Sequence, residues 1–320
     1  MSYSIISKRR SELMGLAILM ILAFHANDMP IGALNNVRAM GFAGVDIFVL
    51  VSGMGLALSL LRRQQRYGDY LKRRLSRILP AYYAVMVPLC VYNIIRGFAV
   101  PSALFWNLTT MHYWVRPFGA FNWYITGIMT FYLLTPAFVA LIGRAKNKLF
   151  ACVALCAASY GVLWLLLRDG WWQYCDVFYR FPTLFMGIYL GFAIFEEKKE
   201  PVWVVITSLV PGAVYAVLVW RYPDALTLAP VFSLLSVPAC LALAWALDKI
   251  PAKPLAVLGE CSLEIYLLNV TFTEKREGLR RFLDFDEGHF AYYAIMLVVN
   301  IAGGIILHRV IEYVRKNRRV

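Results

Sequence analysis

Apolar segments of about 20 residues recur along the whole chain, and each is long enough to cross a bilayer core about 30 Å thick as a helix. The sequence is 61% hydrophobic and 16% charged, whereas soluble domains carry about 25% charged residues. We therefore predict an all-α polytopic membrane protein, not a soluble helical protein with a large core. Residues 1–320 form a single membrane-embedded domain in this interpretation. The ten predicted spans are residues 13–30, 39–61, 78–97, 119–142, 148–167, 176–195, 202–220, 227–247, 255–273 and 290–313.

Lys and Arg residues are distributed unevenly between these spans. In the ten-span layout, 21 of the 32 lie on the side of both termini, nine lie on the opposite side, and two lie within spans. The positive-inside rule then places the N- and C-termini in the cytoplasm, as in a bacterial-type inner membrane. Because this topology accounts for the net charge of +13, we expect contacts with membrane lipids and no nucleic-acid partner.

Several sequence signatures are missing. The six cysteines have no metal-ligand or redox spacing, and most fall within predicted spans. The chain has no Walker loop, no HExxH motif and no dinucleotide fingerprint. These absences argue against an ATP-driven pump and a zinc protease, and we expect no metal.

Two ionisable residues lie inside the first two predicted spans. His25 lies roughly 18 Å above Leu13, and Asp46 lies roughly 9 Å below Met40 on the returning helix, so the two reach nearly the same level. Such groups in lipid-length segments are functional by default. A histidine can take a proton from a hydroxyl, and a carboxylate can orient it. The pattern predicts a catalytic base with Asp46 as first-choice partner and Glu264 as second, or else a structural hydrogen bond between helices.

A basic stretch precedes the third span on the predicted cytoplasmic side. Arg74 and Arg77 are three residues apart and share a helix face, and Lys72 and Arg73 lie beside them. Arginines held in this way can bind phosphates in a bidentate manner. The simpler interpretation is ordinary anchoring at the inner face, or binding of lipid headgroups.

Polar and aromatic residues in later spans form a third group of candidates. Glu264 would be expensive in the middle of a bilayer without a partner, whereas Arg180 lies one turn inside the outer boundary and could reach the interface. Aromatic faces suit sugar rings, although they also anchor spans at the interface. His112, His289 and His308 are expected to be structural or exposed. The candidates for the outer, substrate-binding mouth are Asn122, Trp123, Arg180, Glu264, Tyr266 and Asn269.

Six stretches, taken in order, resemble a known family. They are GLAILMILAFHAN, GFAGVDIFVLVSGM, YLKRRLSRILPAYY, NWYITGIMTFYLLTP, RFPTLFMGIYLG and LGECSLEIYLLN, and together they resemble the acyltransferase-3 family of membrane acyltransferases over about residues 9 to 270. The resemblance implies ten membrane helices, a cytoplasmic acyl-CoA donor such as acetyl-CoA, and transfer to a sugar hydroxyl at the outer face. It also implies that His25 occupies the position of the family's essential first-helix histidine. Arg74 and Arg77 occupy that of the arginine pair proposed to contact the donor.

Two positions depart from the family pattern. Relatives often carry an arginine eleven residues before the histidine; here that position is Met14, and Arg10 lies one helical turn earlier. We therefore include Arg10 among the candidate substrate-binding residues. The SLEIYLL segment often ends in a histidine, and here it ends in Asn269.

The combined expectation is an O-acyltransferase. Arg73, Arg74 and Arg77 hold the CoA phosphates, the pantetheine arm rises between helices, and His25 acts either as base or as transient acyl carrier. The acceptor is a surface polysaccharide, a lipid-linked glycan precursor, a cell-wall sugar or a small metabolite. A proton-coupled transporter is the main alternative, because intramembrane charges can also form a proton path, although the spans show no paired halves with matching broken helices. A non-catalytic scaffold or receptor is the third.

Overall fold

A computed structural model describes residues 3–26, 32–63, 65–116, 122–198, 202–224, 226–274 and 290–317. All regular secondary structure in these ranges is helical, which confirms the predicted fold class. The long helices are α2 (Arg10–His25), α4 (Gly44–Arg62), α5 (Tyr67–Ile95), α8 (Trp123–Arg144), α9 (Lys148–Arg168), α11 (Phe181–Phe195), α12 (Val202–Arg221), α13 (Ala229–Leu247), α15 (Ser262–Glu274) and α17 (Phe290–Asn317). The short ones are α1 (Ser4–Lys8), η1 (Gly32–Leu34), α3 (Asn35–Ala39), η2 (Met40–Ala43), α6 (Ser102–Leu108), α7 (His112–Val115), η3 (Trp172–Tyr174), α10 (Cys175–Phe178) and α14 (Lys253–Glu260).

Each of the ten predicted spans overlaps one of these helices or a helix pair, but not all of the helices are long enough to cross a membrane. Among the described residues, seven helices qualify by length and composition, and the bent pair α14–α15, with an angle of 68°, makes up to eight. The helix α2 has 16 residues, fewer than the roughly 20 that a membrane-spanning helix needs. The chain is thus an integral membrane protein by its helices, and the count of ten and the cytoplasmic termini stay predictions.

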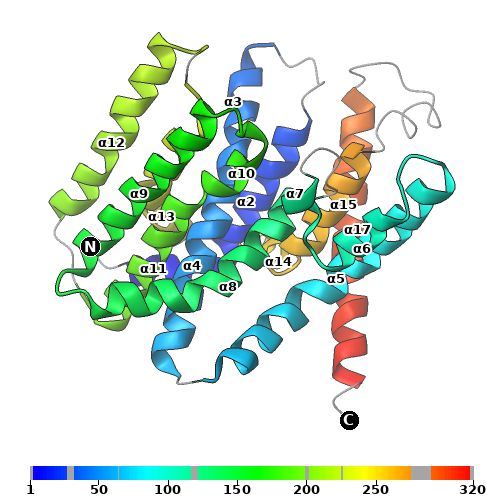
Figure 1. Ribbon diagram of the computed structural model, residues 1–320, viewed down its shortest axis with the longest axis horizontal. Helices are drawn as coiled ribbons and strands as arrows, with labels where there is room; N and C mark the ends of the chain where they lie inside the picture. The colour runs from blue at the N-terminus through cyan, green and yellow to red at the C-terminus, as the bar shows by residue number, and fades with distance from the viewer. Residues whose placement is uncertain are drawn as a thin grey trace.

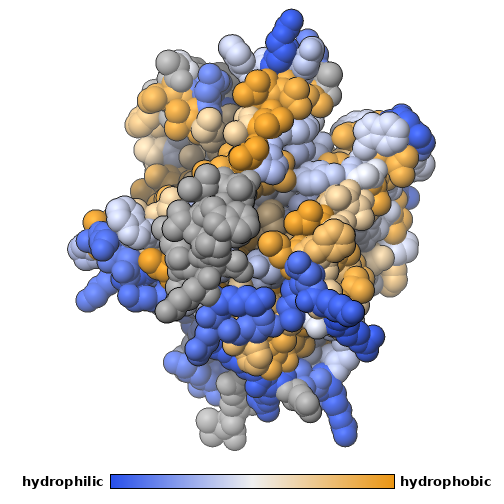
Figure 2. Space-filling view, turned by 90° about the vertical axis from the view of Figure 1, so that its left-hand side faces the viewer, coloured by the Kyte–Doolittle hydropathy of each residue, from blue (hydrophilic) through white to orange (hydrophobic). Residues whose placement is uncertain are grey.

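The helices alternate in direction through the bundle. In Figure 1 the end of α4, the start of α5 and the end of α17 lie at the lower end, while the end of α12 and the start of α17 lie at the upper end. Figure 2 shows the adjoining face, where hydrophilic side chains gather towards the lower end and hydrophobic ones cover much of the rest. This distribution agrees with the uneven placement of Lys and Arg in the sequence.

The basic stretch before the third span belongs to the same helix as the span. The helix α5 begins at Tyr67, eleven residues before the predicted start of the span, and its 29 residues extend roughly 43 Å. This length exceeds a hydrocarbon core of about 30 Å. Arg74 and Arg77 are therefore held on a rigid helix that continues into the membrane-spanning segment.

Glycines allow the central helices to approach each other closely, as is typical of membrane helix interfaces. A Cβ at Gly187 of α11 would overlap the Leu50 carbonyl oxygen of α4, and one at Gly259 of α14 would overlap the Ser11 carbonyl oxygen of α2. A Cβ at Gly304 of α17 would meet the backbone of Ile265 in α15 at 2.8 Å. These contacts bring α2, α15 and α17 together around the candidate site.

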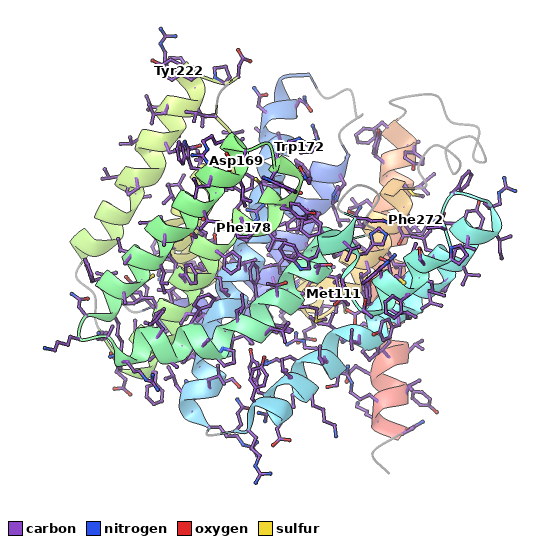
Figure 3. The ribbon with its side chains drawn as sticks, viewed as in Figure 1. Met111, Asp169, Trp172, Phe178, Tyr222 and Phe272 are labelled. Carbon is purple, nitrogen blue, oxygen red and sulfur yellow. The ribbon has the colours of Figure 1, made fainter. Side chains whose placement is uncertain are left out.

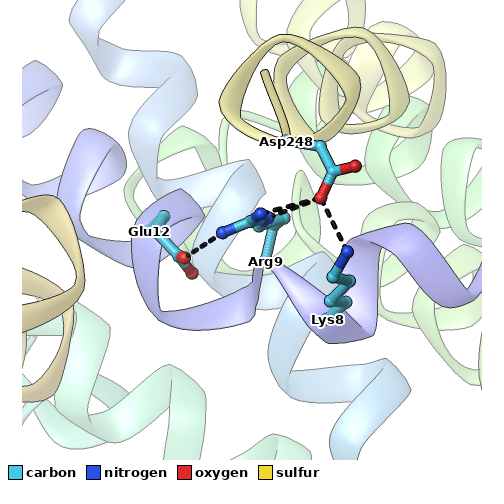
Figure 4. Close-up of polar contacts among 4 residues, drawn as sticks. All are labelled: Lys8, Arg9, Glu12 and Asp248. Atoms are coloured by element: carbon cyan, nitrogen blue, oxygen red, sulfur yellow. Dashed lines mark hydrogen bonds and ion pairs between the residues drawn. The ribbon is translucent and has the colours of Figure 1, made fainter. Parts of the chain in front are cut away.

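An ion-pair network attaches the N-terminal helices to the end of α13 (Figure 4). Lys8 Nζ lies 2.9 Å and Arg9 Nη2 lies 2.8 Å from Asp248 Oδ1, and Arg9 Nη1 lies 3.0 Å from Glu12 Oε1. The hydrogen bonds from Lys8 and Arg9 lower the pKa of Asp248 from 3.8 to about 2. The network therefore ties α1 and the start of α2 to the C-terminal end of α13.

We expect Asp248→Asn to lower the melting temperature of the protein at neutral pH. Because the pKa of Asp248 is lower in the folded state than in the unfolded state, its ion pairs stabilise the fold above about pH 4 and lose that effect as the pH falls towards 2. The difference in melting temperature between variant and wild type should therefore be present at pH 7 and shrink below pH 4. Asp224→Asn, at an exposed carboxylate, is the control, and a pH-independent difference for Asp248→Asn would contradict the expectation.

Candidate functional site

Two cavities lie one above the other along the same three helices, α2, α15 and α17. The first, which we call the arginine cavity, has a volume of about 310 Å³ and also reaches α4, α5 and α8. The second, which we call the histidine cavity, has a volume of about 290 Å³. Both volumes lie close to about 300 Å³, which is the lower limit of the usual range for small-molecule sites.

Cations from different helices converge in the arginine cavity. Arg10 of α2, Arg74 and Arg77 of α5, and Arg315 of α17 line it. Gly55 leaves room for the Arg10 guanidinium, because a Cβ there would lie 3.2 Å from Arg10 Nη1. None of the ion pairs between described residues involves Arg10, Arg74 or Arg77. The cavity therefore presents three guanidinium groups that a bound anion can neutralise.

Two of the four residues of the basic stretch line the arginine cavity, and donor binding by this stretch stays a prediction. Arg74 and Arg77 line the arginine cavity, whereas Lys72 and Arg73 are exposed and line neither cavity. The physical reason is helix rotation: residues one or two positions before Arg74 point to another side of α5. The assignment of Lys72 and Arg73 to the same site is therefore not supported.

Glu264 and His308 form a pair in the arginine cavity. His308 Nδ1 lies 3.1 Å from Glu264 Oε1, and Glu264 is 5% exposed. Glu264 was predicted as a second-choice partner for His25, and His308 was expected to be structural or exposed; the structure instead joins the two across α15 and α17. The signal in the sequence was that both are ionisable residues inside consecutive predicted spans, Glu264 in 255–273 and His308 in 290–313.

His25 lies at the end of α2 and lines the histidine cavity with two asparagines. Its polar neighbours are the Asn269 side chain and the Ile21 backbone. Asn300 of α17, which the sequence analysis did not single out, lines the same cavity and is 3% exposed. His25 Nδ1, Asn269 Oδ1 and Asn300 Oδ1 are buried without a hydrogen-bond partner among the described residues. The sequence did contain a signal for Asn300, because it is a polar residue in the middle of the last apolar segment.

Within the described part of the chain, the arginine and histidine cavities share no lining residue. On α15, Tyr266 lines the first and Asn269 lines the second, which separates them by one turn, or roughly 4.5 Å. Near this level Ile265 packs on Gly304 of α17. The passage that was predicted from the arginines to His25 is therefore represented by two separate cavities, with the contact between Ile265 and Gly304 near the level between them.

Asp46 does not pair with His25 as predicted. Its Oδ2 forms an ion pair with Arg180 Nη1, and the Thr183 hydroxyl lies 3.0 Å from its Oδ1. Asp46 is 1% exposed and Arg180 is fully buried, with its guanidinium 4.2 Å from the centre of the Phe42 ring. Opposite charges in a low-dielectric interior pair with each other because an unpaired one is very costly there. The expectation that Arg180 lines the outer mouth is also wrong in this geometry.

The remaining candidates around FNWY have mixed outcomes. Asn122 caps α8, since its Oδ1 accepts from the Ile125 amide at 3.2 Å, and it also accepts from the Tyr266 hydroxyl at 3.1 Å. Tyr266 lines the arginine cavity, with its ring 5.1 Å from that of Tyr124. Trp123 is half-buried and lines neither cavity. Asn122 is thus connected to the arginine cavity through its hydrogen bond with Tyr266.

Comparison with known proteins bears directly on the resemblance noted in the sequence. A family model described as an acyltransferase domain matches residues 13–309, which is nearly the whole chain. Comparisons with curated proteins and with solved structures returned no match. The matched region contains His25, Arg74, Arg77, Glu264 and Asn300, whereas Arg10 and Arg315 of the arginine cavity lie outside it. The chain belongs to the acyltransferase-3 family of membrane acyltransferases.

Proposed function

We propose that this protein transfers an acyl group, such as acetyl, from cytoplasmic acyl-CoA to a hydroxyl of a carbohydrate acceptor at the outer face of the membrane. The observation that carries the proposal is the stacking of two cavities along α2, α15 and α17, with arginines in one and His25 in the other. Family membership supports the type of reaction.

The arginine cavity would hold the donor. Arg10, Arg74 and Arg77 offer planar guanidinium groups that bind phosphate in a bidentate manner, and CoA carries several phosphate charges. Arg10 takes part in this proposal although Met14 occupies the usual family position. The Glu264–His308 pair lies in the same cavity and would contact the donor rather than the acceptor.

The histidine cavity would hold the acceptor hydroxyl. As a base, His25 takes the hydroxyl proton while the oxygen attacks the thioester carbonyl; the C–S bond breaks and the CoA thiolate leaves. As an acyl carrier, the His25 nitrogen attacks the thioester carbonyl, the C–S bond breaks and the CoA thiolate leaves. The acceptor hydroxyl then attacks the acyl-imidazole, the N–acyl bond breaks, and the hydroxyl proton passes to the released imidazole nitrogen. Asn269, and not a carboxylate, is the polar side chain next to the imidazole in either case. The pantetheine arm must pass the layer around Ile265, so an opening between Tyr266 and Asn269 is part of the reaction cycle.

The basic reaction can be tested in sealed vesicles that contain the protein. Acetyl-CoA labelled in its acetyl group is supplied only at the face that carries the arginine cavity, and an extract of envelope glycans is enclosed inside. We expect alkali-labile label on the enclosed glycans and free CoA outside. Label that stays in acetyl-CoA, with normal insertion of the protein, would contradict the proposal.

We expect the double variant Arg74→Ala, Arg77→Ala to raise the Kd for acetyl-CoA at least tenfold, or about 1.4 kcal/mol. The reason is loss of charge-assisted hydrogen bonds to phosphate, each of which contributes about 1.5–3 kcal/mol. Isothermal titration calorimetry on the purified protein measures the change. The matched control is Lys72→Ala, Arg73→Ala, which removes the same charge from exposed positions of the same helix. Equal losses in both double variants would mean that general electrostatics, not the cavity, binds the donor.

A further inference from the structure

A third cavity, which we call the apolar groove, lies between α5, α15 and α17 and has a volume of about 540 Å³. Among the residues that the structure describes, no charged side chain lines it. The one hydroxyl that these residues contribute to its wall, that of Thr271, donates to the Leu267 carbonyl at 2.9 Å. The groove is also open to the outside of the bundle, because Val299, Ile306 and Val310 on its wall are 37%, 63% and 53% exposed. In a membrane this groove faces lipid and offers contacts to hydrocarbon alone.

The apolar groove adjoins the histidine cavity. Phe272, on α15, lines both of them, and Figure 3 places it on the α15 side of the molecule, far from Tyr222 at the end of α12. On α17, the last residue that lines the histidine cavity is Asn300, and the first residue that lines the apolar groove is its neighbour Val299. A molecule can therefore have one part in each space and bend around the Phe272 ring.

The two spaces differ in chemistry. The histidine cavity contains buried acceptor atoms without partners, Asn269 Oδ1 and Asn300 Oδ1, on side chains that are 6% and 3% exposed, together with His25 Nδ1. Buried polar atoms of this kind require hydrogen-bond partners, and hydroxyl groups of a ligand would satisfy them. The described residues that line the neighbouring apolar groove offer apolar contacts and no free side-chain hydrogen-bond donor, so the ligand part that fits it is a hydrocarbon chain. Together they fit an amphipathic molecule with a hydroxylated head.

The length and direction of the groove agree with a lipid chain. From Val299 to Val310 the groove follows α17 for eleven residues, or roughly 16 Å. Half of a hydrocarbon core about 30 Å thick is about 15 Å. The groove runs from the level of the histidine cavity towards the level of His308 in the arginine cavity. A lipid with its head near His25 would thus extend its chain towards the bilayer centre.

We propose that the acceptor of this protein is a glycolipid, whose sugar head enters the histidine cavity while its hydrocarbon chain lies in the apolar groove. The inference rests on the proposed function for the role of the sugar as acceptor. The acceptor enters sideways from the membrane past Phe272, and the donor approaches from the arginine cavity on the other side of Ile265.

Photolabelling in vesicles tests this occupancy without acyl transfer. The probes are a glucosyl diacylglycerol and a phosphatidylcholine that carry the same diazirine in the same acyl chain, at equal mole fractions. We expect the glucosyl probe to label α17 at least fivefold more than the phosphatidylcholine probe. Ala84→Trp on α5 and Val299→Trp on α17 fill the groove from exposed positions on two helices, and each should reduce this labelling at least fivefold. Ala154→Trp, at an exposed alanine of α9, is the matched control and should leave it unchanged.

The outcomes separate this inference from the proposed function. Equal labelling by the two probes, or undiminished labelling in both groove variants with normal melting temperatures, would show an ordinary lipid contact and overturn the glycolipid site. Acetyl transfer to methyl glucoside as fast as to glucosyl diacylglycerol would also overturn it while leaving the acyltransferase proposal intact. Preferential glycolipid labelling in a protein that transfers no acetyl group would support the site and overturn the enzyme.

Discussion

His25→Ala abolishes acyl transfer if this residue is the reacting group of the histidine cavity. Loss of a general base alone lowers the rate about 10²- to 10⁴-fold, and loss of an acyl carrier removes the route entirely. The measurement is transfer of labelled acetyl from acetyl-CoA to glycan in vesicles, at matched protein insertion. His112→Ala is the control, since His112 is also a buried histidine but lines neither cavity.

The same variant distinguishes the two roles of His25. An acyl carrier exchanges labelled CoA into acetyl-CoA in the absence of any acceptor, whereas a base requires the acceptor before the thioester breaks. Exchange without acceptor in the wild type, lost in His25→Ala, would establish a covalent acyl-imidazole. Acceptor transfer within tenfold of wild type in His25→Ala would remove this residue from the mechanism altogether.

The second large effect concerns stability. We expect Arg180→Met or Asp46→Asn alone to destabilise the protein by about 3–5 kcal/mol, because each leaves a buried polar or charged partner without its ion pair. The double variant should recover a large part of this loss, since two contacting residues couple strongly in such a cycle. Reversible unfolding in mixed detergent micelles measures the free energies.

The control for this cycle is an ion pair with access to solvent. Lys148 Nζ lies 3.0 Å from Glu196 Oε1, with side chains 22% and 29% exposed. Glu196→Gln should cost about 1 kcal/mol or less, because such pairs contribute little net stability. If the Arg180 and Asp46 single variants cost no more than this, or if their losses simply add in the double variant, the interpretation as a buried coupled pair is wrong.

Much of the site could be anticipated from residue spacing. The three-residue spacing of Arg74 and Arg77 predicts a shared face, and both side chains do line one cavity with Arg10. The order of the six motifs predicted the family that the comparison then identified. The depth of His25 in the membrane follows from the rise per residue of a helix and stays a prediction. These properties depend on one helix at a time.

Partnerships between helices were predicted incorrectly. Asp46 was expected to pair with His25, but it forms an ion pair with Arg180 instead. Glu264 was the second-choice partner for His25, but it contacts His308. Depth alone does not choose between such partners, because the rotation of each helix about its axis also decides which side chains meet.

Sequence by itself therefore determined the helical segments, the class of protein and the residues capable of chemistry. Tertiary structure alone decided that His25 lies beside two asparagines and next to an apolar groove. The physical reason is close packing at small residues: where Gly259 lies on the Ser11 carbonyl and Gly304 on Ile265, the backbone contacts set the rotation of α2, α15 and α17. That rotation turns Asn269, Asn300 and Phe272 towards His25, which no periodicity along the chain reveals.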